Sequence, residues 1–206
     1  MLFFGTNSMD HIAYFKKNDK KLAGIIDKPI DELPVLKNIP LTLIRSIINQ
    51  QLSTRVSEVI YKRFLGLYDG KEPALQQILH TPLTKLRSVG FSNAKAGYVH
   101  NIAAFCIEQN VTDKMLKSMT DEEVMDLLTQ IKGVGHWTVE MLLMFSLGRE
   151  DVIAIDDFGL KEAMIKLYRI KTTDKRQLRE KMMKISDKWR PYRTYACMYL
   201  WKWKNG

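Results

Sequence analysis

The stretch Leu128-Thr-Gln-Ile-Lys-Gly-Val-Gly-His-Trp-Thr-Val-Glu140 decides the fold of this 206-residue chain. Apolar residues recur at helical spacing on both sides of its glycines, so the stretch predicts two helices joined by a very short hairpin. We expect Gly133 and Gly135 to take positive φ angles there and to expose backbone N–H groups at the start of the second helix. Such N–H groups, with the helix dipole behind them, form a site for an anion.

An isolated Gly-Val-Gly is equally consistent with a structural turn between two helices. Its surroundings favour a phosphate grip, because basic side chains flank the glycines and the whole chain carries a net charge of +9 with a pI near 9.4. A basic protein favours a polyanionic partner. The residues that we expect to contact a nucleic-acid backbone are Lys132, Gly133, Val134, Gly135 and His136.

Helical periodicity continues along nearly the whole chain, and no segment shows sustained period-two alternation, so we expect an all-α fold. No apolar run is long enough to span a membrane and no signal peptide is recognisable, which favours a cytoplasmic protein with no membrane partner. The predicted helices span approximately residues 10–26, 41–51, 53–68, 74–80, 84–89, 93–109, 112–117, 121–130, 137–147, 158–168, 174–189 and 191–204.

Three further segments carry a family resemblance: Ser46-Ile-Ile-Asn-Gln-Gln-Leu-Ser53, Leu86-Arg-Ser-Val-Gly-Phe-Ser-Asn-Ala-Lys-Ala96 and Trp189-Arg-Pro-Tyr-Arg-Thr-Tyr-Ala-Cys-Met-Tyr-Leu-Trp201. With the hairpin and the acidic pair of Asp151-Val-Ile-Ala-Ile-Asp-Asp-Phe-Gly159, they make the chain from Leu41 onward resemble the helix-hairpin-helix DNA glycosylases, specifically the alkylbase (DNA-3-methyladenine glycosylase II) branch. The resemblance implies two helical lobes with the active-site cleft between them. Residues 36–145 would form a central lobe with the hairpin at about 131–136, and residues 1–35 plus 146–206 would form the second.

That family extrudes alkylated purines such as 3-methyladenine and 7-methylguanine from double-stranded DNA and hydrolyses the N-glycosidic bond, which leaves an abasic site. Bond cleavage develops positive charge on the sugar, and a fixed carboxylate stabilises it. Asp157 matches the family's catalytic aspartate, the second of the paired acids. Its alternative role is to cap the helix that starts at Phe158, and both roles can hold together. We assign Asp156 to structure or to a solvated edge.

The resemblance places Trp137, Phe158 and Trp201 in the base pocket, where electron-rich rings would stack on a cationic base. For each of these rings the alternative is core packing. Neighbouring candidates are Trp189, Tyr192, Tyr195 and Trp203. Family members that also cleave the strand carry a lysine two residues after the second hairpin glycine. Trp137 occupies that position here, so we expect a monofunctional enzyme.

Gln51 matches the residue that wedges into the vacated base stack, with Gln50 beside it; the alternative is an ordinary polar helix end. We expect no required cofactor, although the family's hairpin implies a Na⁺ or K⁺ ion at the backbone of Ile131 and Gly133. The only cysteines, Cys106 and Cys197, cannot hold a four-thiolate iron–sulfur cluster. We expect a monomer. A non-catalytic helix-hairpin-helix DNA-binding module and a structural interaction protein are the alternative functions.

Overall fold

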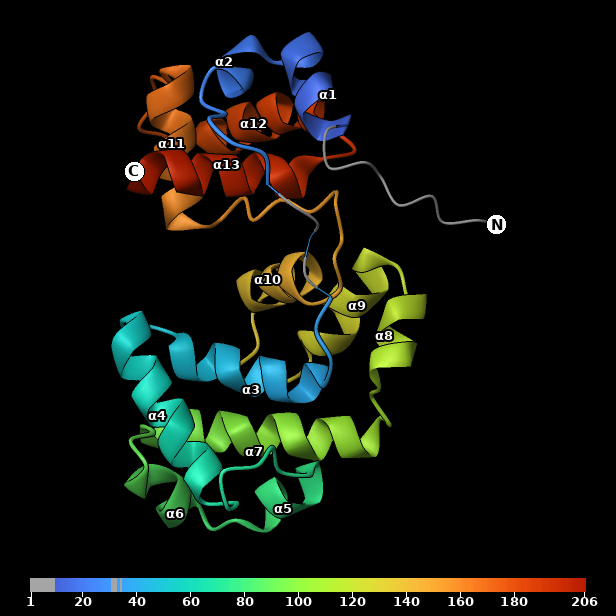
Figure 1. Cartoon of the computed structure of the whole chain (residues 1–206), viewed down its shortest axis with the longest axis vertical. Helices are drawn as coiled ribbons and strands as arrows, with labels where there is room; N and C mark the ends of the chain where they lie inside the picture. The colour runs from blue at the N-terminus through green and yellow to red at the C-terminus, as the bar shows by residue number, and fades with distance from the viewer. Residues whose placement is uncertain (1–9, 31–32, 34) are drawn as a thin grey trace. The chain divides into compact units, whose positions relative to one another are not determined.

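The computed structural model describes residues 10–30, 33 and 35–206, and Figure 1 shows its helices in chain order. Within these residues one isolated antiparallel bridge, Val35 with Leu147, is the only β-type pairing. The helices are α1 (Asp10–Asn18), α2 (Lys20–Ala23), α3 (Ile39–Asn49), α4 (Thr54–Gly66), α5 (Leu75–His80), α6 (Leu83–Ser88), α7 (Asn93–Glu108), α8 (Asp113–Ser118), α9 (Asp121–Leu128), α10 (His136–Phe145), α11 (Phe158–Tyr168), α12 (Lys175–Ser186), the 3₁₀ helix η1 (Asp187–Trp189) and α13 (Arg193–Asn205).

Short polar side chains start most of these helices. Ser92 accepts the Lys95 N–H at 3.2 Å, and Thr120 forms a reciprocal capping box with Glu123. The single helix predicted over residues 10–26 is wrong, because Asp19 ends α1 and caps α2. Its carboxylate accepts the backbone N–H groups of Lys21 and Leu22, each at 3.1 Å. An aspartate at this position hydrogen-bonds the backbone in a non-helical conformation and so restarts the helix.

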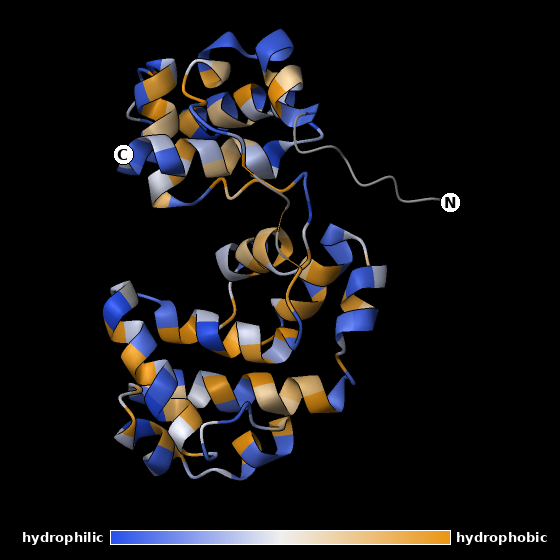
Figure 2. Cartoon of the chain, viewed as in Figure 1, coloured by the Kyte–Doolittle hydropathy of each residue, from blue (hydrophilic) through white to orange (hydrophobic). Residues whose placement is uncertain are grey.

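The chain divides into two compact units, and residues Val35–Leu147 form one of them. In this unit α3 and α5 both pack against the long helix α7. Fully buried side chains from α3, α4 and α7 form its core, and Figure 2 shows the orange hydrophobic stripes along these helices. They include Leu43, Ile47, Phe64, Val99 and Ile102.

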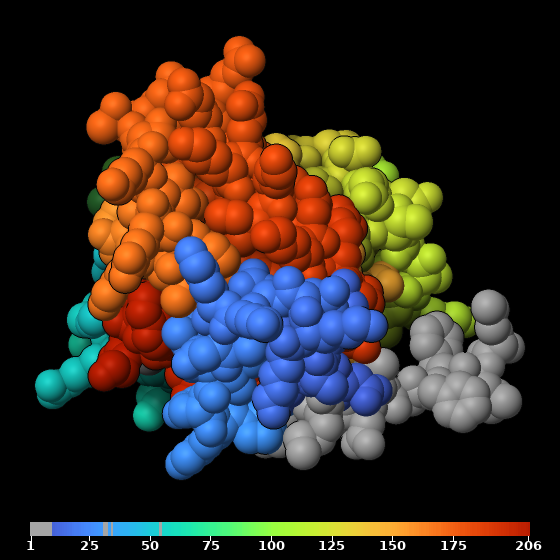
Figure 3. All heavy atoms as spheres, turned by 90° about the horizontal axis from the view of Figure 1, so that it is seen from above, coloured from blue at the N-terminus to red at the C-terminus, as the bar shows by residue number. Residues whose placement is uncertain are grey.

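The second unit combines Gly148–Gly206 with the described residues of Met1–Pro34. Helix α13 packs against α11 and also contacts α2, so both parts of the chain share one core. In Figure 3 the blue atoms of α1 and α2 lie against the red atoms of the C-terminal helices. Asp19 connects the two parts, because its carboxylate accepts Tyr168 Oη at 2.6 Å and Trp189 Nε1 at 3.0 Å.

Among the described residues, no helix is both long enough and apolar enough to span a membrane.

Candidate functional site

The hairpin between α9 and α10 contains two glycines with different structural roles. Gly133 has a φ of +107°, and a Cβ atom there would lie 2.3 Å from Cγ of Tyr98. Gly135 is the N-cap of α10 with a φ of −101°, and a Cβ atom there would meet nothing within 4 Å. The prediction of positive φ is therefore confirmed for Gly133 and wrong for Gly135. The reason is that an N-cap residue enters its helix from extended backbone, which any residue adopts.

Buried contacts hold the hairpin from inside. Ile131 and Val134 are buried, and the Val134 N–H donates to the Ile131 carbonyl at 2.9 Å. From α7, the Asn101 amide donates to the Lys132 carbonyl at 3.1 Å. On the outside, Lys132, Gly135 and His136 are exposed. The exposed side therefore combines a cation with the N-terminus of α10, which is the positive end of the helix dipole.

The loop after α3 is fixed by a lysine that sequence reasoning did not assign. Lys95 Nζ of α7 donates to the carbonyls of Ile48 at 2.9 Å and Gln50 at 2.7 Å. Burial lowers the pKa of this lysine. Lys95 stands in the quoted segment Leu86–Ala96, so the motif contained the signal, but only the structure shows its acceptors.

The two glutamines of this loop differ in orientation. Gln50 Nε2 lies 3.4 Å from Thr138 Oγ1 in the first turn of α10, which connects the loop to the hairpin helix. Gln51 is exposed and has a φ of +59°, a left-handed conformation that is uncommon for residues other than glycine. Such conformations persist where surrounding contacts impose them, and they cluster at functional sites.

Asp157 lies in the other unit, at the N-terminus of α11. Its Oδ1 atom accepts the Leu160 backbone N–H at 2.7 Å and Trp201 Nε1 of α13 at 2.8 Å. One donor is the helix backbone and the other is a side chain 44 positions away in sequence. These two bonds fix the orientation of the carboxylate, and the capping role considered from the sequence is present.

Two aromatic rings accompany this carboxylate. Trp201 is half-buried, whereas Phe158 is 71% exposed and lies under Lys204 Nζ, 5.0 Å from the ring centroid. Gly159 leaves room for the pair, because a Cβ atom there would lie 3.2 Å from Asp157 Oδ1 and 3.3 Å from Trp201 Cδ1. The structure thus brings Asp157, Phe158 and Trp201 together within one unit. Trp137 belongs to the other unit, on the first turn of α10, with 41% of its surface exposed.

Two of the neighbouring pocket candidates are core residues instead. Trp189 is fully buried and its indole N–H donates to Asp19. Tyr195 is 5% exposed, and its ring stacks on His11 with centroids 4.1 Å apart. Their inclusion among the pocket candidates was wrong, because both rings are used in packing within the unit.

Asp156 takes part in surface ion pairs, as its assignment to structure anticipated. It pairs with Arg179 at 2.6 Å and with Lys161 at 3.3 Å. Burial alone would raise the pKa of its carboxyl group, but the hydrogen bonds from Arg179 and Lys161 lower the pKa more strongly. The charge of Asp156 is therefore already compensated at the surface.

The hairpin with its exposed helix N-terminus and the carboxylate fixed beside aromatic rings are features expected of the helical family that the sequence resembles, and comparison with known proteins identifies that family. Residues 44–188 match the HhH-GPD superfamily of base excision DNA repair proteins, and the chain belongs to this superfamily. The resemblance to this superfamily and the all-α fold are thereby confirmed.

Relatives of known structure share nearly the full length of the chain. DNA-3-methyladenine glycosylase 1 of Schizosaccharomyces pombe is 32% identical over 200 residues, which cover 96% of this chain and 86% of the relative. Its structure in complex with abasic DNA superposes with a TM-score of 0.79 and covers 96% of each chain. A DNA-3-methyladenine glycosidase of Bacillus halodurans is 32% identical with a TM-score of 0.82, covering 98% of this chain and 92% of that one.

Proposed function

We propose that this protein is a base excision repair glycosylase that takes alkylated purines such as 3-methyladenine and 7-methylguanine out of double-stranded DNA and hydrolyses their N-glycosidic bond. The observation that carries the proposal is the Asp157 carboxylate, fixed by two donors next to Trp201 and Phe158 in a chain of this superfamily. A purely DNA-binding hairpin module has no need for such a carboxylate.

DNA backbone binding is assigned to the exposed side of the hairpin. Lys132 supplies a cation, His136 supplies a polar ring, and the N-terminus of α10 supplies backbone donors for a phosphate. Gly135 supports this assignment, because neither its φ angle nor its surroundings within the protein require a glycine. A phosphate that approaches the backbone closely would require one.

Gln51 is proposed to fill the gap that the extruded nucleotide leaves. Extrusion costs unstacking and unpairing energy, and a side chain in the gap offsets part of it. Lys95 fixes the preceding carbonyls and Gln51 adopts its left-handed conformation at an exposed tip. Gln50, which reaches Thr138, is proposed to support this tip and the DNA contact beside it.

The chemical step is assigned to Asp157. Positive charge develops on the sugar as the glycosidic bond breaks, and a pre-oriented carboxylate stabilises that charge and positions or deprotonates the attacking water. The base leaves as a neutral purine because N3 or N7 alkylation makes it cationic beforehand. Trp201, Phe158 and Trp137 are proposed to stack on this cationic base.

We further propose type II specificity and monofunctional hydrolysis. Trp137 has no amine that could attack the sugar, and Lys132 lies in the exposed hairpin. Without a Schiff base, the product is an intact abasic strand.

A Na⁺ or K⁺ ion at the hairpin is a separate proposal. Backbone carbonyl oxygens suit hard cations, and the carbonyls of Ile131 and Gly133 would hold the ion. The Lys132 carbonyl accepts the Asn101 amide, and the Ile131 carbonyl accepts the Val134 N–H, which leaves Ile131 one lone pair for the ion. A bound ion would fix the hairpin carbonyls and would add positive charge near the phosphate. The proposed hydrolysis requires no cofactor.

The deciding experiment compares Asp157→Asn with Asp156→Asn on duplexes that carry defined alkylated bases. Asparagine keeps an acceptor oxygen for both Leu160 N–H and Trp201 Nε1, so the variant tests the charge and not the cap. We expect base excision to fall about a hundred- to a thousandfold for Asp157→Asn, with DNA binding retained. Asp156→Asn should retain nearly full activity.

Near-normal excision by Asp157→Asn would leave this residue as a helix cap only. Borohydride added during turnover tests the proposal of monofunctional hydrolysis. A covalent protein–DNA adduct in high yield would contradict monofunctional hydrolysis.

A further inference from the structure

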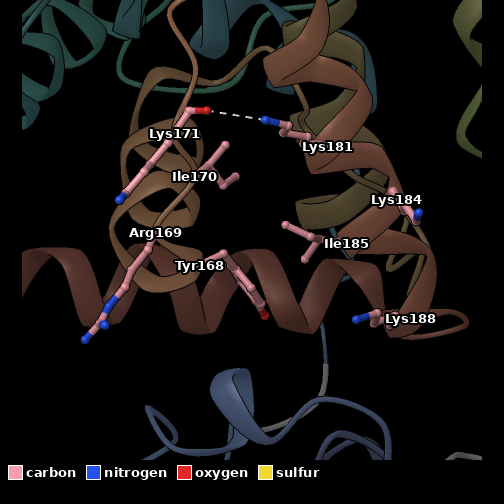
Figure 4. A pocket seen from close by; sticks show the side chains of 8 residues that line it. All are labelled: Tyr168, Arg169, Ile170, Lys171, Lys181, Lys184, Ile185 and Lys188. Carbon is pink, nitrogen blue, oxygen red and sulfur yellow. Dashed lines mark hydrogen bonds between the residues drawn. The ribbon is translucent and has the colours of Figure 1, made fainter.

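A basic hollow lies at the opposite end of α11 from Asp157, between the end of that helix and α12 (Figure 4). Its volume is about 480 Å³. Five cationic side chains line it, and no carboxylate does: Arg169, Lys171, Lys181, Lys184 and Lys188. Because α11 has 11 residues, the hollow lies roughly 16 Å from Asp157 along the helix axis.

The cations of this hollow have no acidic partners among the described residues. Lys181 donates only to the Lys171 backbone carbonyl, at 3.3 Å. The acids of the same segment are engaged elsewhere, since Glu180 pairs with Arg176 and Asp187 pairs with Arg190. The positive charge in the hollow is therefore not compensated within the described part of the chain.

Keeping these cations together has a cost. Lys184 stands three residues after Lys181 and four before Lys188, spacings at which like charges on a helix repel. Arg169 ends α11 in the left-handed conformation, with a φ of +53°, where glycine or asparagine is usual. An anionic occupant would offset the repulsion.

The floor of the hollow is apolar and restricts the kind of anion. Ile170 and Ile185 point into the space between the two helices (Figure 4). A DNA phosphate makes no favourable contact with this apolar surface. A single-stranded base would need an open aromatic face, but the Tyr168 ring contacts Trp189 and lies under Lys21, and its hydroxyl donates to Asp19.

We propose that this hollow binds an acidic segment of a partner protein that carries one aliphatic side chain. The aliphatic side chain lies between Ile170 and Ile185, and the flanking carboxylates pair with the lysines and Arg169. The contact is made at the other end of α11 from Asp157, so it leaves the carboxylate accessible to DNA. The inference does not depend on the catalytic assignment.

The test uses a short fluorescein-labelled peptide with aspartates and glutamates on both sides of a single leucine, titrated with the full chain at low salt. The charge-reversal variant is Lys184→Glu with Lys188→Glu. The matched control is Lys16→Glu with Lys17→Glu, which makes the same change in net charge on exposed residues of α1. A second peptide replaces the leucine with serine.

We expect the Lys184/Lys188 variant to bind the leucine peptide at least about tenfold more weakly than the control does, because two charge-assisted contacts become repulsive. The serine peptide should bind wild-type protein about tenfold more weakly than the leucine peptide, because it buries no aliphatic group. Excision of a damaged base should be the same in both variants.

Four outcomes would overturn the proposal. The wild-type chain could fail to bind the leucine peptide, the two variants could bind it equally, or the two peptides could bind equally. The fourth outcome is a larger loss of affinity for undamaged duplex in the Lys184/Lys188 variant than in the control, which would assign the hollow to DNA.

Discussion

Replacing each hairpin glycine with alanine distinguishes its contribution to the stability of the fold from its contribution to phosphate binding. Gly133→Ala forces a side chain onto a φ of +107° and places its methyl group 2.3 Å from Cγ of Tyr98. The backbone term costs about 1–3 kcal/mol and the overpacking about 1–3 kcal/mol. The free energy of unfolding should therefore fall by about 2–6 kcal/mol.

Gly135→Ala should leave stability nearly unchanged. Alanine lowers the entropy of the unfolded chain, which stabilises by about 0.4–1 kcal/mol, but it is a poorer N-cap than glycine by a similar amount. On DNA the added methyl group would hold a phosphate away from the backbone. Loss of one charge-assisted hydrogen bond costs about 1.5–3 kcal/mol, which corresponds to roughly a ten- to hundredfold weaker Kd.

Urea unfolding and fluorescence anisotropy with a plain duplex measure the two quantities on the same preparations. Tyr98→Ala supplies the matched background, because it removes the ring atoms 2.3 and 2.5 Å from the added methyl group and keeps the Cβ atom at 2.8 Å. The cost of Gly133→Ala should therefore be smaller in that background. An unchanged Kd in folded Gly135→Ala would return this glycine to a structural turn. Equal costs of Gly133→Ala with and without the Tyr98 ring would refute the packing argument.

Three further predictions concern other parts of the molecule. Trp201→Phe keeps an aromatic ring but removes the donor to Asp157, so single-turnover excision should fall about tenfold or more with little change in lesion-DNA affinity; a loss of affinity alone would make Trp201 a stacking residue. Gln51→Gly should raise the free energy of unfolding by about 1 kcal/mol, because glycine adopts the left-handed conformation without strain. Both Gln51→Gly and Gln51→Ala should slow excision more from a paired site than from a mismatch. Equal slowing in both contexts would contradict the proposal that Gln51 fills the gap. Burial lowers the pKa of His11 below its ordinary 6.5, against the opposing effect of Glu150 and Asp10. As the pH falls, the unfolded chain therefore takes up a proton before the folded chain does, so the free energy of unfolding should fall below about pH 6.5. His11→Gln should flatten this dependence in urea unfolding, and an unchanged slope in the variant would assign the pH dependence to another group.

The sequence predicts structural features that depend on residues close to one another in the chain, such as the ends of helices. The helix over 158–168 appears in the structure with those bounds, and the helix predicted from residue 53 begins there, with Ser53 as the N-cap of α4. Such starts depend on a side chain and an N–H group two or three residues away. The break at Asp19 belongs to the same class of signal, but the apolar period that continues beyond it conceals the break.

Pairings between distant residues could not be predicted in this way. Trp201 lies next to Asp157 only because α11 and α13 pack together, and Lys95 reaches the end of α3 only because α7 packs against α3. Both residues stand within the family motifs, yet a motif does not state which atom its side chain will contact. The predicted positive φ at Gly135 is wrong for a different reason. The sequence alone does not distinguish a glycine that the backbone conformation requires from a glycine that a closely approaching ligand would require.

In each unit a long-range donor fixes a locally encoded element. Lys95 holds the carbonyls that precede Gln51, and Trp201 holds the carboxylate of Asp157. Both donors come from helices that are well packed in the core of their own unit, so the groups they hold are oriented before any ligand arrives. Pre-orientation matters most where charge develops during a reaction, because a group that is already in place pays no reorganisation cost at that moment. Substitutions of the donors should therefore act on rates more than on the stability of the fold.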